Sequence, residues 1–389
     1  MSRLNELIQE LCPDGVEYET IKETVGVNRG KRLTKSQLSD DGKYEVYHGS
    51  KDSILGKYYE YNAPANTVIV INTGGIGGVK FLDKPFWCSD GSFWLGQSSR
   101  INNKYLYYYL SGYENYFYSQ KRVGGVPTIE RRVVEDFKIP IPPLDVQNEI
   151  VRILDTFTSH TAELQAELQA RKEQYEYYRN KLLTFEKDDK NVKWMKLGEI
   201  GSFIRGKRFV RTDIVENGIP CIHYGDMYTY YGLKATKTKG MLRKDLAAKM
   251  RFAQKNDVVI VAAGENKDDI GVGLAWLGEE PVAVHDACFI FKSKMYPQYV
   301  AHFLRTDYYH KQIKKYVSEA KICSISAKGL AKTIIPVPTF EKQQHISSIL
   351  DKFEALVNDL TEGIPAEIAA VQEQYEYYRN KLLTFKQRA

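Results

Sequence analysis

The chain has 389 residues, 43% of them hydrophobic, and a formal net charge of +6. This length and composition exclude a disordered or fibrous chain and allow two or three domains with cores of their own. The small positive excess permits a polyanionic partner without requiring one. We expect a cytoplasmic protein with no membrane contact, because no run reaches the roughly 18 apolar residues of a membrane span. Five widely spaced cysteines and seven scattered histidines predict neither a disulfide framework nor a metal site.

An internal repeat divides the chain into two homologous halves. Residues 173–185 and residues 373–385 both read EQYEYYRNKLLTF, and identity over thirteen residues cannot arise by chance. Weaker matches precede these tails: the Gly-Lys-Arg triplets at Gly30 and Gly206, and the acidic residues Asp90 and Asp286 before a phenylalanine. Each half therefore consists of a divergent front and a well-matched tail.

In the first half, the front is predicted to be β-rich. Short β-branched runs such as residues 68–71 alternate with Gly, Asn and Asp turns, and one helix is expected at residues 103–119. The tail after this front is predicted to be one long helix, because its apolar residues recur at spacings of three and four. Inside it, residues 162–169 form the tandem AELQAELQ, which is good helix-forming sequence.

The second half repeats this order. A β-rich front carries a second helix at residues 297–316, and another helical tail comes after the proline pair Pro336 and Pro338. Gly363 and Pro365 are expected to break or kink that tail, with Pro365 in the first turn of a helix.

Two similar motifs lie between front and tail, Pro140-Ile-Pro-Pro143 with Gln147 in the first half and Pro336-Val-Pro338 with Gln343 in the second. Together with the two identical tails, they resemble the motifs of the specificity subunits of type I restriction-modification systems. The resemblance covers the whole chain, and the AELQ tandem is similar to tetrapeptide repeats in one branch of the family. The fronts diverge, as the recognition domains of that family do, so no base identity can be assigned from them.

The resemblance implies an α+β fold in which two β-rich globular target-recognition domains are separated by two long antiparallel helices, with a pseudo-twofold internal repeat. The implied segments are residues 1–142 and 188–338 for the recognition domains, and 143–187 and 339–389 for the conserved helices. The implied function is that of a non-catalytic DNA-specificity subunit that reads a bipartite, asymmetric target. It would dock two modification (adenine methyltransferase) subunits, and restriction subunits would join the complex.

By the same resemblance, this chain binds no cofactor, whereas S-adenosylmethionine, ATP and Mg belong to the partner subunits. No catalytic residues are predicted, because the sequence lacks an Asn/Asp-Pro-Pro-Tyr/Phe motif, and the glycine run at residues 74–78 fits no nucleotide loop. Three alternatives stay open. They are a specificity subunit of a related methyltransferase-nuclease system, a self-contained methyltransferase, and a coiled-coil scaffold protein without a DNA function.

Basic and amide side chains in turn-rich segments are the candidate contacts to double-stranded DNA, because they bind phosphates and base edges. A solvated charge cluster is the alternative interpretation of each. The candidates in the first front are Arg29, Lys31, Arg32, His48, Lys51, Asn72, Arg122 and Thr128. The candidates in the second front are Arg205, Lys207, Arg208, Arg211, His223, Tyr224, Asn266, Lys321 and Ser324.

The tails carry polar residues that are identical in both halves although the fronts differ. Such identity indicates a partner common to both halves, and we expect one modification subunit to dock on each; packing of the helices themselves is the alternative. The candidate partner-binding residues are Tyr177, Arg179, Asn180 and Lys181, with Tyr377, Arg379, Asn380 and Lys381.

Overall fold

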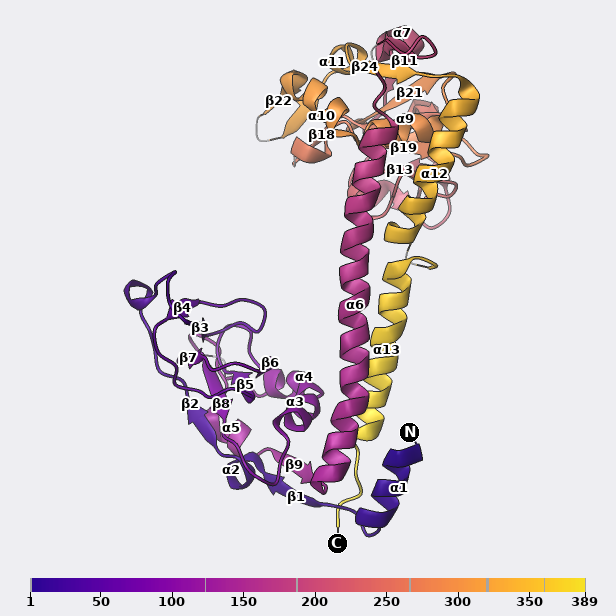
Figure 1. Ribbon diagram of the computed structural model, residues 1–389. Coiled ribbons are helices and arrows are strands. Elements are labelled where there is room, and N and C mark those ends of the chain that lie inside the picture. Colours follow the sequence, from indigo (N-terminus) through magenta and orange to yellow (C-terminus); the bar gives the residue numbers. More distant parts are fainter. Residues whose placement is uncertain are drawn as a thin grey trace. The chain divides into compact units, whose positions relative to one another are not determined.

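The computed structural model describes residues 2–122, 124–186, 188–265, 267–319, 322–359 and 361–388. The chain divides into two compact units (Figure 1). Unit 1 contains Met1–Glu163 together with Ile368–Ala389, and unit 2 contains Leu164–Glu367. The units therefore differ from the sequence halves, because each unit combines the front of one half with the repeated tail of the other.

Unit 1 is built on a four-stranded sheet of order β2-β8-β5-β6, a three-stranded sheet β4-β3-β7 and the pair β1-β9. The central strand β5 is buried at every residue, and α3 packs against β5 and β6. The elements of the front are α1 (Ser2–Leu11), β1 (Glu17–Thr20), α2 (Ile21–Thr24), β2 (Val27–Arg29), η1 (Lys35–Gln37), β3 (Tyr44–Tyr47), β4 (Gly56–Tyr58), β5 (Thr67–Ile71), β6 (Val79–Leu82), β7 (Trp87–Cys88), β8 (Ser92–Leu95), α3 (Asn103–Ser111), α4 (Glu114–Ser119), α5 (Arg131–Glu135) and β9 (Lys138–Ile141).

Unit 2 repeats this plan with two five-stranded sheets, β11-β21-β17-β19-β14 and β12-β15-β13-β20-β16, beside the sheet β18-β23-β22 and the pair β10-β24. Its elements are β10 (Lys193–Lys196), α7 (Leu197–Ile200), β11 (Gly201–Arg205), η2 (Arg211–Asp213), β12 (Ile214–Val215), β13 (Ile219–Ile222), α8 (Asp226–Thr229), β14 (Lys234–Ala235), β15 (Gly240–Leu242), η3 (Lys244–Lys249), β16 (Phe252–Ala253), β17 (Val258–Val261), β18 (Ala263–Gly264), η4 (Lys267–Asp269), β19 (Gly273–Trp276), β20 (Val282–Val284), β21 (Cys288–Ser293), α9 (Pro297–Phe303), α10 (Asp307–Ile313), η5 (Lys314–Tyr316), β22 (Val317–Ser318), β23 (Cys323–Ile325), α11 (Ala327–Ala331) and β24 (Ile334–Val337).

The tails are helical, as predicted, and they differ in continuity. The first is a single helix, α6 (Leu144–Leu182), of 39 residues, or about 58 Å at 1.5 Å per residue. The second is divided into α12 (Phe340–Asn358) and α13 (Ile364–Leu382), which confirms the break at Gly363. Pro365 is the second residue of α13, where its missing N–H has no helical acceptor to lose. The chain leaves unit 1 along α6 and re-enters it along α13.

The two helices predicted near the ends of the fronts are each present as a pair of shorter helices. In the first front, α3 and α4 are separated at Gly112 and Tyr113; in the second, α9 and α10 are separated at residues 304–306. The predicted combination of β-rich fronts and long helices is thus confirmed.

Glutamines of the predicted motifs fasten each long helix to its own front. The Gln147 side chain accepts a hydrogen bond from the Asn102 N–H at 2.7 Å and donates to the Pro142 carbonyl at 2.7 Å. Gln343 does the same in unit 2, with Tyr296 N–H at 3.0 Å and the Pro338 carbonyl at 2.9 Å. Because both glutamines are buried, these bonds satisfy backbone groups that would otherwise be left unpaired.

Identical tails occupy equivalent places in the two units. In unit 2 the ring of Tyr178 stacks on Phe353 of α12, with centroids 5.5 Å apart. In unit 1 the ring of Tyr378 stacks on Phe157 of α6, also at 5.5 Å. The same tails also contact the front of the other half, since the Tyr175 hydroxyl bonds with His302 Nδ1 at 3.2 Å and the Tyr375 ring lies 6.3 Å from that of Tyr108.

Candidate nucleic-acid interface and partner surface

In unit 1, the ends of two parallel strands bring polar residues together. Strands β3 and β7 run parallel with Tyr47 opposite Cys88, so the residues after both strands meet at one edge of the sheet. There His48 Nδ1 lies 3.3 Å from Asp90 Oδ1, and the backbone N–H of Gly91 donates to the same ring nitrogen at 3.1 Å. We call this the strand-end edge of unit 1.

Unit 2 has the corresponding edge after the parallel strands β13 and β20. His223 comes directly after β13, and His285 and Asp286 come directly after β20. The rings of His223, Tyr224 and His285 lie against one another, with centroids 4.7 to 5.0 Å apart. The same topology therefore positions a histidine and an aspartate at the strand-end edge of each unit.

A cavity of about 460 Å³ opens at the strand-end edge of unit 2. Its walls combine aromatic rings, guanidinium groups, carboxylates and two exposed aliphatic side chains, a mixture typical of a site that contacts both polar and flat apolar groups. The lining includes Arg208, Phe209, Arg211, His223, Tyr224, Glu265, His285, Asp286 and Ile322.

Burial keeps the two histidines of this cavity uncharged. It lowers the pKa of His223, and the nearby Arg211 guanidinium lowers that pKa further. It also lowers the pKa of His285, against the opposing effect of Asp286. Both rings are therefore neutral near pH 7, and they act as hydrogen-bonding groups rather than as cations.

The predicted basic residues of the first front fall into two groups. Arg29, Lys31 and Arg32 are exposed, and the Lys31 N–H donates to the Cys88 carbonyl at 2.8 Å, which fixes this segment beside the strand-end edge. Lys51 instead forms an ion pair with Glu114 at 2.8 Å, and Arg122 forms one with Glu130.

Two further candidates of unit 1, Asn72 and Thr128, lie in segments that contact each other. Thr128 is bridged to Thr73, and the adjacent Asn72 is buried, with its Oδ1 unpaired within the described residues. Asn72 comes directly after β5, so the amide lies close to the end of a central strand.

The second front brings most of its candidates to one place. Arg208, Arg211, His223 and Tyr224 line the cavity, and the Arg205 Nε–H donates to the Asp286 carbonyl at 2.8 Å. The remaining candidates are an exposed Lys207, Ser324 in β23, which pairs with Ala263 at the cavity wall, and Asn266 and Lys321, which lie outside the described residues.

The sequence predictions did not include Asp90, Asp286, His285, Glu265 and Arg251. For the two aspartates a signal was present, because they align in the internal repeat. Arg251 donates to the Arg205 carbonyl at 2.7 Å, which extends the exposed basic segment to the residue before β16, the strand that pairs with β20. No local sequence signal connects Arg251 with Arg205, since the contact is tertiary.

The identical tails present an exposed tyrosine beside a lysine in each unit. The Tyr177 side chain is 58% exposed and Tyr377 is 59% exposed. The ammonium group of Lys181 lies 5.4 Å from the Tyr177 ring centroid, and that of Lys381 lies 5.6 Å from Tyr377. A large exposed ring beside a cation is a common composition for the centre of a protein interface.

The other predicted partner-binding residues make contacts inside their own unit. The Arg179 guanidinium lies 5.2 Å from the centroid of the Tyr175 ring. The Asn180 Oδ1 accepts the backbone N–H of Asp307, the first residue of α10, at 3.0 Å. Arg379 lies over the Tyr375 ring and donates to Asn380 at 3.3 Å. The bond between Asn180 and Asp307 connects the first tail to the rest of unit 2, whereas the contacts of Arg179 and Arg379 lie within the tails.

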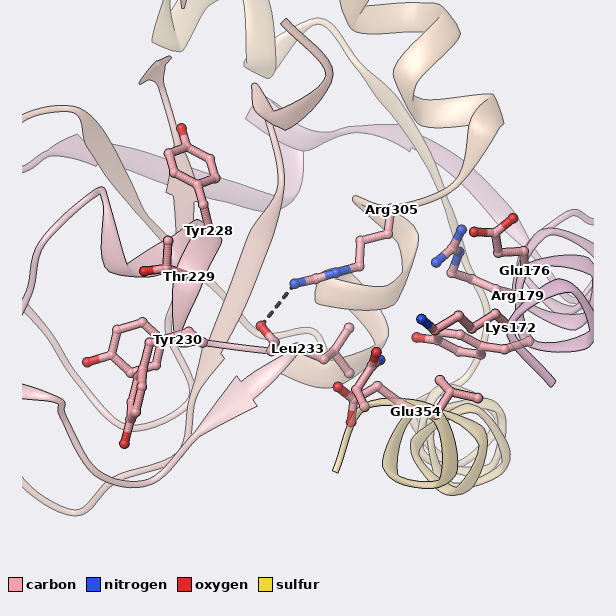
Figure 2. Close-up of a pocket in the computed structure, with 14 residues that line it drawn as sticks. Lys172, Glu176, Arg179, Tyr228, Thr229, Tyr230, Leu233, Arg305 and Glu354 are labelled. Atoms are coloured by element: carbon pink, nitrogen blue, oxygen red, sulfur yellow. Dashed lines mark hydrogen bonds between the residues drawn. The ribbon is translucent and has the colours of Figure 1, made fainter. Parts of the chain in front are cut away.

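A second cavity of unit 2, of about 430 Å³, lies between α6, α12 and residues 228–233. Figure 2 shows Lys172 and Arg179 on the α6 side and Arg305 donating to the backbone next to Leu233, a bond of 2.9 Å to the Gly232 carbonyl. Residue 305 corresponds to Ser111 in unit 1, because Tyr299 and Tyr105, each six residues earlier, bond to equivalent prolines. Arg305 is thus particular to unit 2, whereas Glu176 and Arg179 of the lining recur in unit 1 as Glu376 and Arg379.

The described residues contain neither a membrane helix nor a metal cluster. Among them no helix is long and apolar enough to cross a membrane, and no group of three His, Cys, Asp or Glu side chains is arranged to hold a metal ion. All five cysteines are buried free thiols, and burial raises the pKa of Cys221 to about 12.

Comparisons with known proteins agree with one another. The family described as "Type I restriction modification DNA specificity domain" matches residues 13–174 and again residues 189–370. The chain is 32% identical to the specificity subunit of an Escherichia coli type I restriction enzyme, over 99% of this chain and 97% of that protein. It is 29% identical to a putative type I restriction enzyme specificity subunit of Haemophilus influenzae, over 95% and 96% of the two chains.

Solved structures show the same fold. The S subunit of a type I restriction-modification system from M. genitalium superposes with a TM-score of 0.59 at 18% identity, covering 95% of this chain and 96% of the other. A chain from a study of complex assembly and conformational transition in the type I system superposes with a TM-score of 0.61 at 16% identity, covering 95% and 98%.

Proposed function

The chain belongs to the type I restriction-modification DNA specificity family, and from that premise we propose which of its surfaces read DNA and which bind partner subunits. It is the non-catalytic subunit that supplies DNA specificity to a type I complex. The observation that carries our proposal is the recurrence, in both units, of a strand-end edge with a histidine and an aspartate flanked by exposed basic residues.

Each strand-end edge reads one half of a bipartite target. The edges share their topology and differ in most side chains, so the two half-sites differ in sequence. Arg29, Lys31 and Arg32 in unit 1, and Arg205 and Lys207 in unit 2, contact phosphates and fix the register of each unit on the duplex.

Exchange of one front tests this division of labour. Replacing residues 1–142 by the first front of another family member will alter one half-site of the methylated sequence and leave the other unchanged, because each unit has its own reading edge. The sites methylated in cells that carry the chimera and its modification subunit give the result. A change in both half-sites would refute independent recognition.

Removal of the basic segments tests the phosphate contacts. The variants Lys31→Ala/Arg32→Ala and Lys207→Ala/Arg208→Ala will bind duplex DNA more weakly, and each lost contact will reduce the slope of log K against log salt by about 0.9. Lys193→Ala/Lys196→Ala, which removes the same charge from β10, is the matched control and will leave the slope unchanged. Unaltered affinity and slope in both test variants would place these residues away from DNA.

We further propose that two modification subunits dock on the tails, one at Tyr177 with Lys181 and one at Tyr377 with Lys381. Identity of these residues in both halves supports a common partner, since the fronts that they adjoin differ. By the family resemblance, S-adenosylmethionine is held by the modification subunits, and restriction subunits that join the complex use ATP and Mg.

Single tail variants will therefore lose one partner each. Tyr177→Ala or Tyr377→Ala will shift the complex with purified modification subunit from two copies to one, because the central ring of one interface is gone. Mass photometry of the assembled complex measures the stoichiometry. Tyr59→Ala, at a tyrosine that is 60% exposed in the first front, is the control and will keep both copies. Retention of two copies by both tail variants would contradict docking at these residues.

A further inference from the structure

The histidines of the two strand-end edges have the same proton arrangement. His48 Nδ1 accepts the Gly91 N–H at 3.1 Å, and His223 Nδ1 accepts the Gly225 N–H at 3.2 Å. A ring nitrogen that accepts a hydrogen bond carries no proton, so the N–H of each ring is on Nε2. Asp90 Oδ1 lies 3.3 Å from this unprotonated Nδ1 of His48. No hydrogen bond therefore joins the two atoms, and the Asp90 carboxylate is an acceptor beside the ring.

The Nε2–H donors of these two rings have no acceptor within the described part of the chain. His285 differs, because it forms a hydrogen bond with the backbone of Phe209 as well as accepting the Ala287 N–H at 3.1 Å. His223 lines the 460 Å³ cavity, and only 6% of the residue is exposed. A fixed donor that faces a cavity without an internal partner is suited to an external acceptor.

The charges around the donors decide which acceptor of DNA fits. Asp90 lies beside His48, and Asp286 and Glu265 line the cavity with His223, together with the guanidinium groups of Arg208 and Arg211. Carboxylates repel a phosphate group, whereas they accept hydrogen bonds from the exocyclic amino groups of bases. Because the two carboxylates of the cavity balance its two guanidinium groups, the recess has no excess of positive charge and is suited to a base edge, whereas the exposed Arg205 and Lys207 outside its lining are suited to phosphates.

We propose that His48 and His223 are base-reading residues, each donating its Nε2–H to a base acceptor while Asp90 or Asp286 accepts from an amino group. In the major groove, adenine presents the N7 acceptor beside the N6 amino donor, which is the complement of this pair. Each half-site thus contains an adenine read by its histidine and aspartate. This inference rests on the proposed function, because it requires the strand-end edges to face DNA.

Two substitutions at each histidine separate the donor from the ring. His223→Phe keeps a flat ring in the cavity and removes the N–H, whereas His223→Gln places an amide N–H near the position of Nε2. In the full complex with modification subunits, the Phe variant will lose discrimination at one adenine of one half-site by about ten- to hundred-fold. The Gln variant will keep most of it. His48→Phe and His48→Gln will do the same in the other half-site.

A modified duplex tests the contact at the level of one atom. Replacing that adenine by 7-deazaadenine removes N7, so it will weaken binding of the unmodified chain about as much as the Phe substitution does. It will have no additional effect on the Phe variant, because the contact is already absent.

Three outcomes would overturn the inference. A Phe variant that weakens binding to all sequences equally would make the histidine a phosphate contact. Loss of discrimination at a guanine, cytosine or thymine would overturn the assignment to adenine. Unchanged discrimination in the Phe variants would show that the histidines do not read bases. If exchange of a front still redirects one half-site, the proposed function stands without this inference. If that exchange also has no effect, the inference and the proposed function both fail.

Discussion

Insertion of one further Ala-Glu-Leu-Gln unit after Gln169 will move methylation to a new set of sites whose unspecified spacer is one base pair longer. The tandem lies in the uninterrupted helix α6, so four added residues lengthen that helix by about 6 Å and rotate its C-terminal part by about 40°. One base pair advances the duplex by about 3.4 Å and rotates it by about 35°.

Translation alone predicts nearly two extra base pairs, whereas rotation predicts one. Rotation is decisive, because a reading edge that faces away from its groove makes no contact, while bending of DNA absorbs a small axial error. Sites with the original spacer will no longer be methylated. The newly methylated sites will contain the same two half-site sequences.

Mapping of methylated sites in cells gives the spacer directly. The matched control inserts the same four residues after Asp40, in a turn of the first front, where α6 keeps its length. That variant will retain the original spacer. An active α6 variant with the original spacer would show that the helix does not set the distance between half-sites.

Acidification from pH 7.5 to 5.5 will destabilise unit 2 much more than unit 1. Burial lowers the pKa of four histidines of unit 2, namely His223, His285, His302 and His310. Because each folded-state pKa lies below the unfolded value of about 6.5, the unfolded state binds more protons, and stability is lost as the pH falls below that value. His302 alone accounts for up to about 1.4 kcal/mol per pH unit between its two pKa values.

Hydrogen exchange of the full chain measures this difference, by comparing strands β17 and β21 of unit 2 with β5 and β8 of unit 1. The informative variant is His302→Tyr, since the corresponding residue of unit 1, Tyr108, donates to Asp155 at 2.6 Å where His302 bonds Asp351 at 2.8 Å. It will make unit 2 less sensitive to acid. Equal acid sensitivity of the two units in the unmodified chain would contradict the prediction.

Local patterns were sufficient for most of the fold. Spacings of three and four residues predicted the helical tails, and the Gly363-Pro365 pair predicted the break between α12 and α13. The exchange of tails between units was not predictable. Because residues 173–185 and 373–385 are identical, they must have similar surroundings, but the sequence does not show which front packs against which tail.

The candidate site was predictable to a smaller extent, because its contacts join residues that are far apart in the sequence. Turn-rich polar segments indicated His48 and His223, which do come after parallel strands at equivalent places. Lys51 has its counter-ion Glu114 sixty-three residues away, and Asn180 meets α10 across a separation of 127 residues. Such pairings depend on the tertiary fold, so composition and spacing could not separate residues with internal partners from those that face outward.

The exchange of identical tails also bears on how new DNA specificities arise. A front that moved by recombination from one half of the gene to the other would meet a tail of unchanged sequence, and so would keep the ring contacts of Tyr175 or Tyr375. The front carries its own half of that contact, Tyr108 or His302, along with it. Target sequences would therefore change by transfer of whole fronts, with no compensating substitution in the helices, and inheritance of a new specificity would take one genetic event.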